Sequence, residues 1–323
     1  MKNKALNPAS ELNKDSKIWA CLLHMSFNFA GGIHRYGGLR DTFEPQQAVW
    51  DDAINHMAAN GVNMVLINVE DHILWESHPE ISVKNAWTKD RLRKELDKIR
   101  ALGIEPVPLL NFSATHDAWL KVYERMLSTD TYREVCRNII REVIDVFGQP
   151  RFFHLGMDEE TAQHQQHFDY VVIRNNDLWW SDFYFLIEEV MRGGARPWVW
   201  SDYYWHHQAL FLKNMPKSVL QSNWYYQGEF DLSTMSDSRK QRVQTYLDLE
   251  AHGYDQMPTS SNDQGITTGI GNTVKFCSEH IDDSRLQGFL QTFWKPTIEE
   301  HRGLIMEGIE LMGNAKKWYT RNL

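Results

Sequence analysis

Cysteine is scarce in this chain of 323 residues, and the few cysteines show no spacing that would form a site. Cys21, Cys136 and Cys277 are odd in number and lie far apart, whereas zinc and redox motifs place cysteines within a few residues of one another. The sequence therefore predicts free, buried thiols and no cysteine-bound metal.

Long apolar segments and basic clusters are also missing. No stretch reaches the roughly 18 apolar residues of a membrane span, and the N-terminus lacks the apolar core of a signal peptide. The formal net charge is -9, and lysine and arginine form no run that would attract a nucleic acid or an anionic membrane. We expect neither partner and a cytoplasmic protein; a periplasmic or secreted location stays open, because a signal peptide could have been removed. The oligomeric state is not indicated.

What the chain has in quantity is aromatic side chains. The hydrophobic fraction of 42% and the charged fraction of 24% are ordinary for a globular protein, but 13 tryptophans and 12 tyrosines stand out. Aromatic rings suit stacking on sugar rings, although large cores also use them. By composition alone, core packing is the stronger explanation.

Eight short apolar runs alternate with amphipathic stretches, the pattern of parallel strand and helix units. The predicted strands are 19–29, 62–70, 104–112, 151–158, 196–204, 219–226, 254–261 and 286–294, and the predicted helices lie near 45–60, 88–102, 130–147, 177–193, 206–214, 238–252, 269–282 and 297–320. Eight units favour an α/β fold closed as a (β/α)8 TIM barrel, with residues 17–323 as a single domain and 1–16 as an N-terminal extension. No glycine-rich dinucleotide fingerprint follows the first strand, so no cofactor is expected.

Polar and aromatic residues gather where the predicted strands end, which is where barrels build active sites. They are Asn28 and Arg35; Glu70, Asp71 and His72; Asn111 and His116; Asp158, Glu159 and Glu160; Ser201, Asp202 and Tyr203; Asn223, Trp224 and Tyr225; Ser260, Asn262 and Asp263; Thr292, Trp294 and Lys295. A single strand turns polar merely by leaving the core. A whole ring of carboxylates, amides and aromatic rings favours a polar, sugar-like ligand.

The sharpest segment is FFHLGMDEE at 152–160, where an apolar strand ends in three successive acids. Like charges this close raise at least one pKa, and a carboxyl group that stays protonated near neutral pH can act as a general acid. The alternatives are that Asp158 caps the next helix, or that Glu159 and Glu160 are solvated loop charges.

This segment resembles the family 20 glycoside hydrolases, the β-N-acetylhexosaminidases, whose fourth strand ends in His-x-Gly-x-Asp-Glu. The chain reads His154-Leu155-Gly156-Met157-Asp158-Glu159, and it is similar to bacterial members that carry GMDE here and Trp-Ser-Asp in the fifth strand, which is present as 200–202. INVED at 67–71 and GIEPVPLLNFSATH at 103–116 add to the likeness.

The resemblance implies substrate-assisted retaining hydrolysis of β-linked N-acetylhexosamine, with an oligosaccharide or glycoconjugate as substrate. Asp158 would orient the acetamido group, and Glu159 would serve as general acid and base. The residues that the resemblance places around the sugar are Arg35, Asp71, His116, His154, Trp200, Asp202, Trp224, Tyr225 and Trp294. Which hexosamine, linkage and aglycone is accepted, and whether cleavage is exo or endo, stays open.

Two features of the later strands bear on this hypothesis. The seventh strand segment, YDQMPTSSND, has no glutamate, which common retaining barrels use there as nucleophile, so participation of the substrate is favoured. The eighth ends in Trp294-Lys295-Pro296, where the family commonly has Trp-x-Glu, which puts the contacts to the terminal sugar in doubt. A non-catalytic or altered-specificity carbohydrate-binding barrel is therefore the alternative.

A metal-dependent barrel hydrolase is a further alternative, because 14 histidines are available as ligands. Such barrels usually begin with His-x-His on the first strand, which here has only His24. The sequence therefore predicts no metal centre.

Overall fold

Eight parallel strands form the centre of the molecule in the computed structural model, which describes residues 17–25, 28, 40–42, 45–166 and 168–322. The strands are β1 (Ile18–His24), β2 (Met64–Asn68), β3 (Glu105–Leu109), β4 (Phe152–His154), β5 (Arg196–Trp200), β6 (Leu220–Ser222), β7 (Thr259–Ser261) and β8 (Gly288–Thr292). They pair side by side in the order β6-β5-β4-β3-β2-β1-β8-β7. All eight predicted strands are thus confirmed in position.

The remaining gap, between β6 and β7, is crossed by isolated bridges. Gln221 pairs with Gln256 and Trp224 with Thr259, both in parallel register. These bridges bring the two ends of the sheet together, so the sheet is nearly closed into a barrel. The predicted (β/α)8 fold is confirmed.

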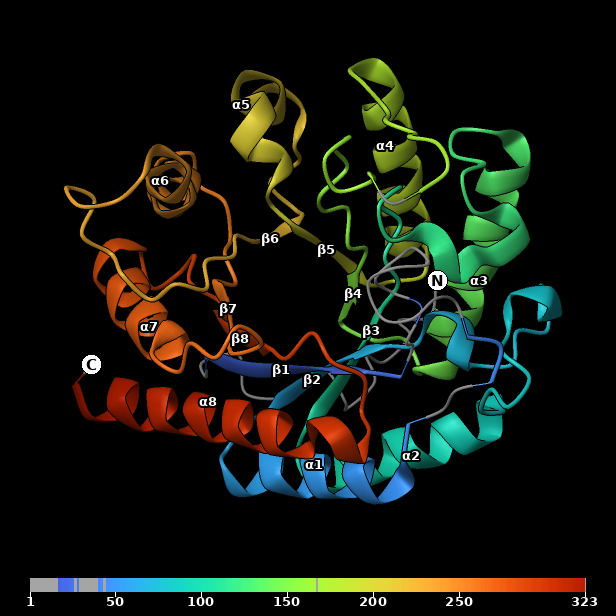
Figure 1. The fold of residues 1–323 in the computed structure, drawn as a ribbon, viewed down its shortest axis with the longest axis horizontal. Helices are drawn as coiled ribbons and strands as arrows, with labels where there is room; N and C mark the ends of the chain where they lie inside the picture. Colours follow the sequence, from blue (N-terminus) through green and yellow to red (C-terminus); the bar gives the residue numbers. More distant parts are fainter. Residues whose placement is uncertain (1–16, 26–27, 29–39, 43–44, 167, 323) are drawn as a thin grey trace, which may run out of the picture.

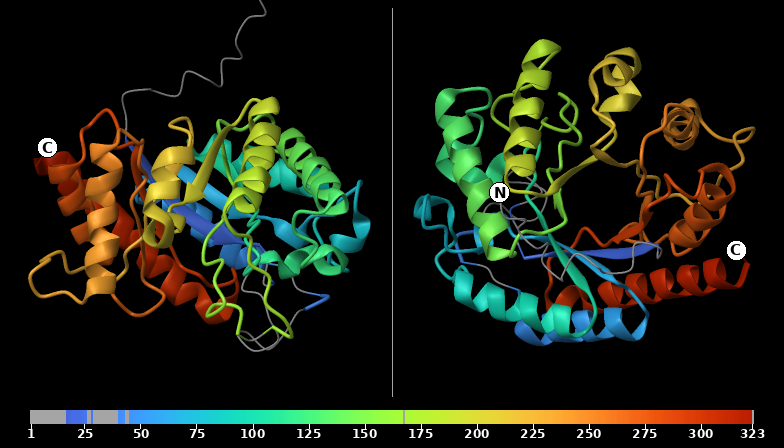
Figure 2. Two further views of the ribbon diagram at one scale, coloured as in Figure 1. Left: turned by 90° about the horizontal axis from the view of Figure 1, so that it is seen from above. Right: turned by 180° about the vertical axis from the view of Figure 1, so that it is seen from behind.

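Helices surround the strands and alternate with them along the chain (Figure 1). They are α1 (Gln47–Ala59), α2 (Lys89–Ala101), α3 (Asp130–Val146), α4 (Asp177–Arg192), α5 (Tyr203–Asn214), α6 (Asp237–Ala251), α7 (Gly269–His280) and α8 (Arg302–Asn322), with short 3-10 turns at Glu70–His72, Pro79–Ile81, Asp117–Tyr123 and Glu299–His301. The two further views show the same ring of helices around the sheet (Figure 2). Two of these helices begin at side-chain caps: the Thr88 and Thr129 hydroxyls accept hydrogen bonds from the backbone N–H groups of Arg91 and Tyr132, each at 3.2 Å.

The strands are shorter than the apolar runs predicted, and one boundary was wrong. Tyr203 and Tyr204 were expected to end the fifth strand, but they begin α5, because the chain turns at Ser201 and Asp202, whose carbonyls accept from the N–H groups of Tyr204 and Trp205. The ring of Tyr203 stacks on Trp179 at 4.1 Å between centroids. These aromatic residues, of a type favoured in strands, therefore pack within and between helices.

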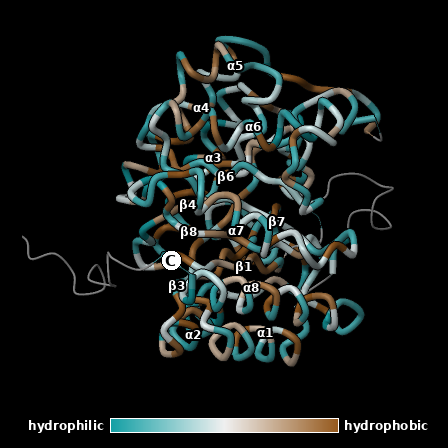
Figure 3. Tube along the Cα trace, turned by 90° about the vertical axis from the view of Figure 1, so that its left-hand side faces the viewer, coloured by the Kyte–Doolittle hydropathy of each residue, from teal (hydrophilic) through white to brown (hydrophobic). Residues whose placement is uncertain are grey.

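The apolar core lies within the sheet and between the sheet and the helices. All described side chains of β1 and β2 are buried, which accounts for their near-continuous apolar sequence. Figure 3 shows hydrophobic β1 near the centre and mixed hydrophobic and hydrophilic stretches along the outer helices. The three cysteines are free and buried, as predicted. Among the described helices, none combines the length and apolar character needed for a membrane span. The predicted extension, residues 1–16, lies outside the described residues.

Candidate active site

The loop that follows β4 has an unusual backbone. Gly156, Met157 and Glu159 all have left-handed backbone angles, with φ of 68°, 73° and 54°. At Gly156 a Cβ atom would lie 2.0 Å from the Asn111 side-chain oxygen and 2.8 Å from the Asn111 Cα atom. Only glycine fits there, which gives a physical reason for the glycine in the His-x-Gly-x-Asp-Glu sequence.

His154, the last residue of β4, helps to shape this loop. Its Nδ1 atom accepts a hydrogen bond from the backbone N–H of Gly156 at 3.0 Å. The ring lies between Trp198 and Trp200, with centroids 5.1 and 4.3 Å away. Burial lowers the pKa of His154 well below its ordinary value, so the imidazole is neutral and its Nε2 carries the proton. The structure therefore places His154 beneath the loop as a positioning residue.

Asp158 is buried and tightly held. Asn111 donates from Nδ2 to Asp158 Oδ1 at 2.8 Å, and His116 Nε2 lies 3.5 Å from Asp158 Oδ2. The hydroxyl of Ser113 donates to the Asp158 carbonyl. Only 9% of the Asp158 side chain is exposed, so its carboxylate has one fixed orientation.

Glu159 is held through its backbone, while its side chain is more accessible. Its backbone N–H donates to Asp202 Oδ2 at 2.7 Å, and its carbonyl accepts from the Thr115 hydroxyl at 2.6 Å. The carboxylate is 18% exposed and lies 3.4 Å from both His116 Nε2 and His164 Nε2. The two neighbouring acids thus face different surroundings.

Two further ionisable groups adjust the charge around the pair. Burial opposes a charge on His116, but the attraction of Asp158 and Glu159 outweighs it and raises the pKa of His116 well above its ordinary value. Burial, together with repulsion from Asp158, raises the pKa of Asp202 to about 8. Near neutral pH the site therefore holds a cationic imidazole and a protonated carboxyl group beside the acid pair.

Glu160, the third acid of the run, has a structural partner. Arg174 donates to both of its carboxylate oxygens, from Nε at 2.9 Å and from Nη2 at 2.5 Å. Arg174 also donates to Asp182 Oδ2 at 3.3 Å and to the Phe112 carbonyl at 3.0 Å. This buried ion pair ties the loop after β4 to α4.

Aromatic side chains form one wall beside the acids. The ring centroids of Trp200 and Trp294 are 5.7 Å apart, those of Trp224 and Tyr226 are 5.0 Å apart, and Trp294 Nε1 donates to the Tyr226 hydroxyl at 3.1 Å. Tyr225 lies on the other side of this segment, where its ring contacts Phe230 at 5.3 Å. Successive side chains of an extended segment point in opposite directions, so Tyr226 joins the wall in place of the predicted Tyr225.

Two other predicted site residues are Asp71 and Arg35, and the contacts of the described residues do not connect either of them to Asp158 or Glu159. Asp71 accepts a hydrogen bond from Asn28 at 2.5 Å and contacts the ring of His72 at 2.9 Å, so it holds these two side chains. Arg35 lies outside the described residues.

Four residues near the acids were not among the predicted site residues: Glu70, Asn111, His164 and Tyr226. Glu70 and Asn111 do end predicted strands, but only the structure shows that Asn111 contacts Asp158 and that Glu70, whose pKa burial raises, is close enough to act electrostatically on His116. His164 belongs to a loop, and no periodic pattern pointed to it. For Tyr226, the alternation of side chains along a strand was the available signal.

His116, Asp158 and Glu159 each offer one potential metal ligand, and these atoms lie within 4.8 Å of one another. Imidazole nitrogen and carboxylate oxygen suit a transition-metal ion such as zinc. The same geometry also fits a charged histidine that holds two carboxylates in place.

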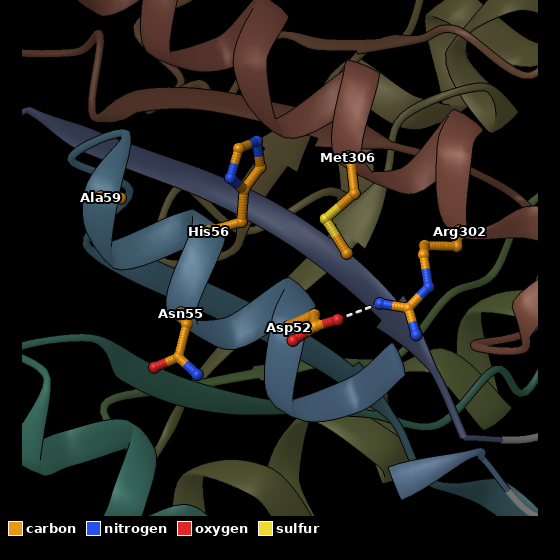
Figure 4. Close-up of a pocket in the computed structure, with 6 residues that line it drawn as sticks. All are labelled: Asp52, Asn55, His56, Ala59, Arg302 and Met306. Atoms are coloured by element: carbon orange, nitrogen blue, oxygen red, sulfur yellow. Dashed lines mark hydrogen bonds and ion pairs between the residues drawn. The ribbon is translucent and has the colours of Figure 1, made fainter. Parts of the chain in front are cut away.

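Two small cavities reach Glu159. One, of about 80 Å³, is lined by Met157, Trp179, Tyr203 and other residues of the loops after β4 and β5. The other, of about 70 Å³, extends towards α6 and is lined by Trp205, Trp224 and Arg242 among others. A third hollow lies on the outside of the barrel between α1 and α8, where Asp52 and Arg302 bind each other (Figure 4). That hollow contains none of the strand-end residues.

Solved structures with the same fold are numerous, although no protein-family model and no curated protein matches the sequence. The structure is similar to the exo β-N-acetylglucosaminidase of Vibrio harveyi, a family 20 protein in complex with N-acetylglucosamine, with a TM-score of 0.63 and 13% identity over 93% of this chain and 54% of that one. The Flavobacterium johnsoniae chitobiase gives a TM-score of 0.60 at 15% identity over 83% of this chain and 46% of that one. Dispersin B gives 0.58 at 14% identity over 93% of this chain and 99% of that one.

At this level of identity the likeness concerns the fold. The chain spans about half the length of the Vibrio and Flavobacterium proteins and nearly the whole length of Dispersin B. The predicted resemblance to family 20 is therefore confirmed at the level of the barrel.

Proposed function

We propose that this chain is a glycoside hydrolase that removes β-linked N-acetylhexosamine by substrate-assisted retaining catalysis. The observation that carries the proposal is the different setting of two adjacent carboxylates at one strand end. Asp158 is buried and fixed by Asn111, whereas Glu159 is more exposed and borders two cavities. The family 20 barrels with the same fold lend it further support.

In the first step the oxygen of the substrate's acetamido group forms a bond to the anomeric carbon while the bond to the leaving oxygen breaks. Glu159 gives its proton to that oxygen. Asp158 accepts the acetamido N–H and stabilises the positive charge that develops on the group. In the second step water attacks the anomeric carbon, the bond to the acetamido oxygen breaks, and the proton of the water passes to Glu159.

Neither the segment around β7 nor Asp202 offers a suitable enzyme nucleophile. The segment around β7, residues 254–263, has no glutamate. Its two aspartates are engaged elsewhere, since Asp255 accepts from Arg196 at 2.8 Å and Asp263 accepts from the Ser261 hydroxyl at 2.7 Å. Asp202 is buried, and its raised pKa keeps it protonated near neutral pH. Attack by the substrate's own acetamido oxygen is consistent with this arrangement.

The aromatic wall supports a sugar as the ligand. Trp200, Trp224 and Trp294 come from the ends of three different strands, and Trp224 lines a cavity that reaches Glu159. Indole faces pack well on the C–H face of a pyranose and on an acetamido methyl group, while the acids and amides serve its polar edge.

The test is turnover of 4-nitrophenyl N-acetyl-β-glucosaminide and galactosaminide by the wild type and by Glu159→Gln, with 4-nitrophenyl β-glucoside as the substrate that lacks the acetamido group. We expect hydrolysis of one or both acetamido substrates, a large loss in the variant, and no turnover of the glucoside. Equal background rates in both proteins would leave the non-catalytic carbohydrate-binding barrel as the better hypothesis. Cleavage of the glucoside would remove the role of the acetamido group.

A metal-dependent hydrolase is the second candidate, and the cluster of His116, Asp158 and Glu159 is the observation that favours it. Dialysis against a chelator, followed by addition of zinc, separates the two. Substrate-assisted hydrolysis should survive chelation unchanged, whereas a metal-dependent reaction should be lost and then restored by the metal.

A further inference from the structure

Arg242 is an unusually placed cation. It lies in the second turn of α6, half-buried, and its guanidinium carbon is 4.4 Å from the ring centroids of both Trp205 and Trp224. The two rings are themselves 4.6 Å apart. Contacts with aromatic faces stabilise the charge and fix the guanidinium plane, while its N–H edges stay available for hydrogen bonds.

Two other arginines of the chain have acidic partners within ion-pair distance. Arg174 pairs with Glu160 and Asp182, and Arg239, one turn earlier on α6, lies 3.7 Å from Glu229. Within the described part of the chain, no carboxylate comes within ion-pair distance of Arg242. Asp202 and Glu159 attract Arg242 from beyond that distance, so a bound anion would be its closest counter-charge.

The cavity in front of Arg242 leads to the proposed general acid. Its lining includes Glu159, His164 and His206 together with Trp205, Trp224 and Arg242, and its volume is about 70 Å³. Asp158, Trp200 and Trp294 do not line it. The cavity therefore borders the proposed general acid without reaching the residue proposed to hold the acetamido group, and it shares Trp224 with the aromatic wall. We place the leaving group on this side of Glu159.

The chemistry of this lining suits an anion. Besides Arg242, the imidazoles of His164 and His206 can donate N–H groups, and Ser238 and Gln241 add polar side chains at the start of α6. Burial lowers the pKa of His206, so it is a neutral donor. Asp202 also lines the cavity, and burial raises its pKa to about 8, so it stays protonated near neutral pH. Glu159 also lines the cavity, and as the proposed general acid it carries its proton, and therefore no charge, when the substrate binds.

We propose that this cavity, the Arg242 pocket, binds an anionic group on the leaving-group part of the substrate, either a carboxylate or a sulfate. The planar guanidinium would bind two of its oxygens, as arginine does with carboxylate and sulfate-like groups. A cavity of about 70 Å³ accommodates such a group as a substituent of a larger aglycone. This inference rests on the proposed function and adds a substrate class to it: N-acetylhexosaminides with an acidic aglycone.

The kinetic test compares two substrates that differ by one carboxylate, 4-nitrophenyl and 3-carboxy-4-nitrophenyl N-acetyl-β-glucosaminide. The quantity measured is the ratio of their kcat/KM values, so that differences in the leaving group cancel between proteins. We expect Arg242→Gln to lower the preference for the carboxylated substrate by about tenfold, the usual loss for a hydrogen bond to a charged group. Arg239→Gln removes a charge from the same helix and should keep the wild-type ratio. An unchanged ratio in Arg242→Gln would overturn the proposal.

A second variant keeps the test decisive if Arg242→Gln does not fold. Arg242→Lys keeps the charge but loses the planar fork, so we expect a ratio between those of the wild type and Arg242→Gln. If Arg242→Gln does not fold, a wild-type ratio in Arg242→Lys overturns the proposal by itself.

A binding measurement separates this inference from the proposed function. Isothermal titration of the Glu159→Gln protein with phenyl, 3-carboxyphenyl and 3-sulfophenyl N-acetyl-β-glucosaminides needs no turnover. The Arg242 pocket is supported if an acidic ligand binds more tightly than the phenyl glycoside and this difference disappears when Arg242→Gln is added. The affinities of the two acidic ligands then show which anion the pocket prefers. Failure of the wild type to hydrolyse any of the substrates counts against the proposed function alone. Equal binding of all three ligands counts against the Arg242 pocket alone.

Discussion

At the scale of single residues, the site is defined by the contrast between Asp158 and Glu159. They are neighbours in sequence, yet the backbone turn at Glu159 sends the two side chains into different surroundings. Asp158 receives a fixed hydrogen bond from Asn111, which orients it for one partner. Glu159 contacts two imidazoles and borders both cavities, as a group that gives and takes a proton must.

Separate substitutions should reveal these different roles. Glu159→Gln should lower kcat/KM by up to about 10⁴-fold for a substrate with a sugar as leaving group, and by much less for a nitrophenyl substrate, whose leaving oxygen needs little protonation. Asp158→Asn should lower both to a similar extent, because the acetamido group takes part whatever the leaving group is. The measurement is steady-state kinetics of the two variants on a chitobiose-type disaccharide and on 4-nitrophenyl N-acetyl-β-glucosaminide. Equal losses for both substrates in Glu159→Gln would contradict its role as the acid.

Asp202 gives a prediction about pH and stability. Its folded-state pKa of about 8 lies above the ordinary 3.8, so between these values the folded chain holds a proton that the unfolded chain releases. The contribution of Asp202 to stability therefore falls as pH rises through this window, by at most about 1.4 kcal/mol per pH unit. Asp202→Asn keeps an oxygen for the Glu159 N–H and removes the titration. The melting temperature of this variant, relative to wild type, should rise steadily from pH 4 to pH 8, as measured by thermal denaturation. A constant difference across that range would show that Asp202 titrates normally.

At the scale of elements, the loop after β4 is the part of the chain where geometry is most constrained. Three left-handed residues are held in place by hydrogen bonds to Asn111, Ser113 and Thr115 of the loop after β3, and by the ion pair of Glu160 with Arg174. Backbone strain of this kind persists only where the surroundings hold it firmly, and it is typical of active sites.

Gly156→Ala tests this constraint. The new Cβ would meet the Asn111 side chain and backbone, so the substitution should cost about 3 kcal/mol or more, from a left-handed alanine and from overpacking together. It should also reduce activity, because Asn111 holds Asp158. Gly194→Ala is the matched control: its φ is 85°, and its Cβ would meet nothing within 4 Å, so only the cost of about 1–2 kcal/mol for the backbone angle applies. Chemical denaturation of both variants gives the comparison. Equal losses would mean that the contact with Asn111 yields without strain.

At the scale of the whole molecule, the barrel brings together strand ends that are far apart in the sequence. Its pairing is uneven. β1 and β2 pair through five successive residues, whereas β6 and β7 are joined by the two bridges at Gln221 and Trp224. The Arg242 pocket lies beside this junction of β6 and β7, because Trp224 lines the pocket and also forms one of the two bridges.

Hydrogen exchange should distinguish the junction of β6 and β7 from the pairing of β1 and β2. We expect peptides covering 219–226 and 254–261 to exchange faster than peptides covering 18–24 and 62–68, because isolated bridges join β6 to β7 where a continuous ladder joins β1 to β2. Exchange followed by mass spectrometry provides the measurement, with the unfolded chain as the reference for intrinsic rates. Similar protection in both regions would show that packing, and not strand pairing, sets the local stability here.

The sequence by itself determined the order of strands and helices, the barrel and the position of the acid pair. These follow from local causes: apolar runs mark buried strands, threonines cap α2 and α3, and the acids come directly after β4. The sequence did not determine where each strand ends, since Tyr203 and Tyr204 have strand-like side chains yet begin α5.

Only the tertiary structure decided which side chains meet. Asn111 reaches Asp158, Arg174 takes up Glu160, and Tyr226 replaces Tyr225 in the aromatic wall, all through contacts between separate strand ends. Arg242 carried no signal in the sequence, because a helical arginine is most often a solvated charge. Its place against two tryptophans beside Glu159 depends on the closure of the barrel, which brings α5, α6 and the loop after β4 around one cavity.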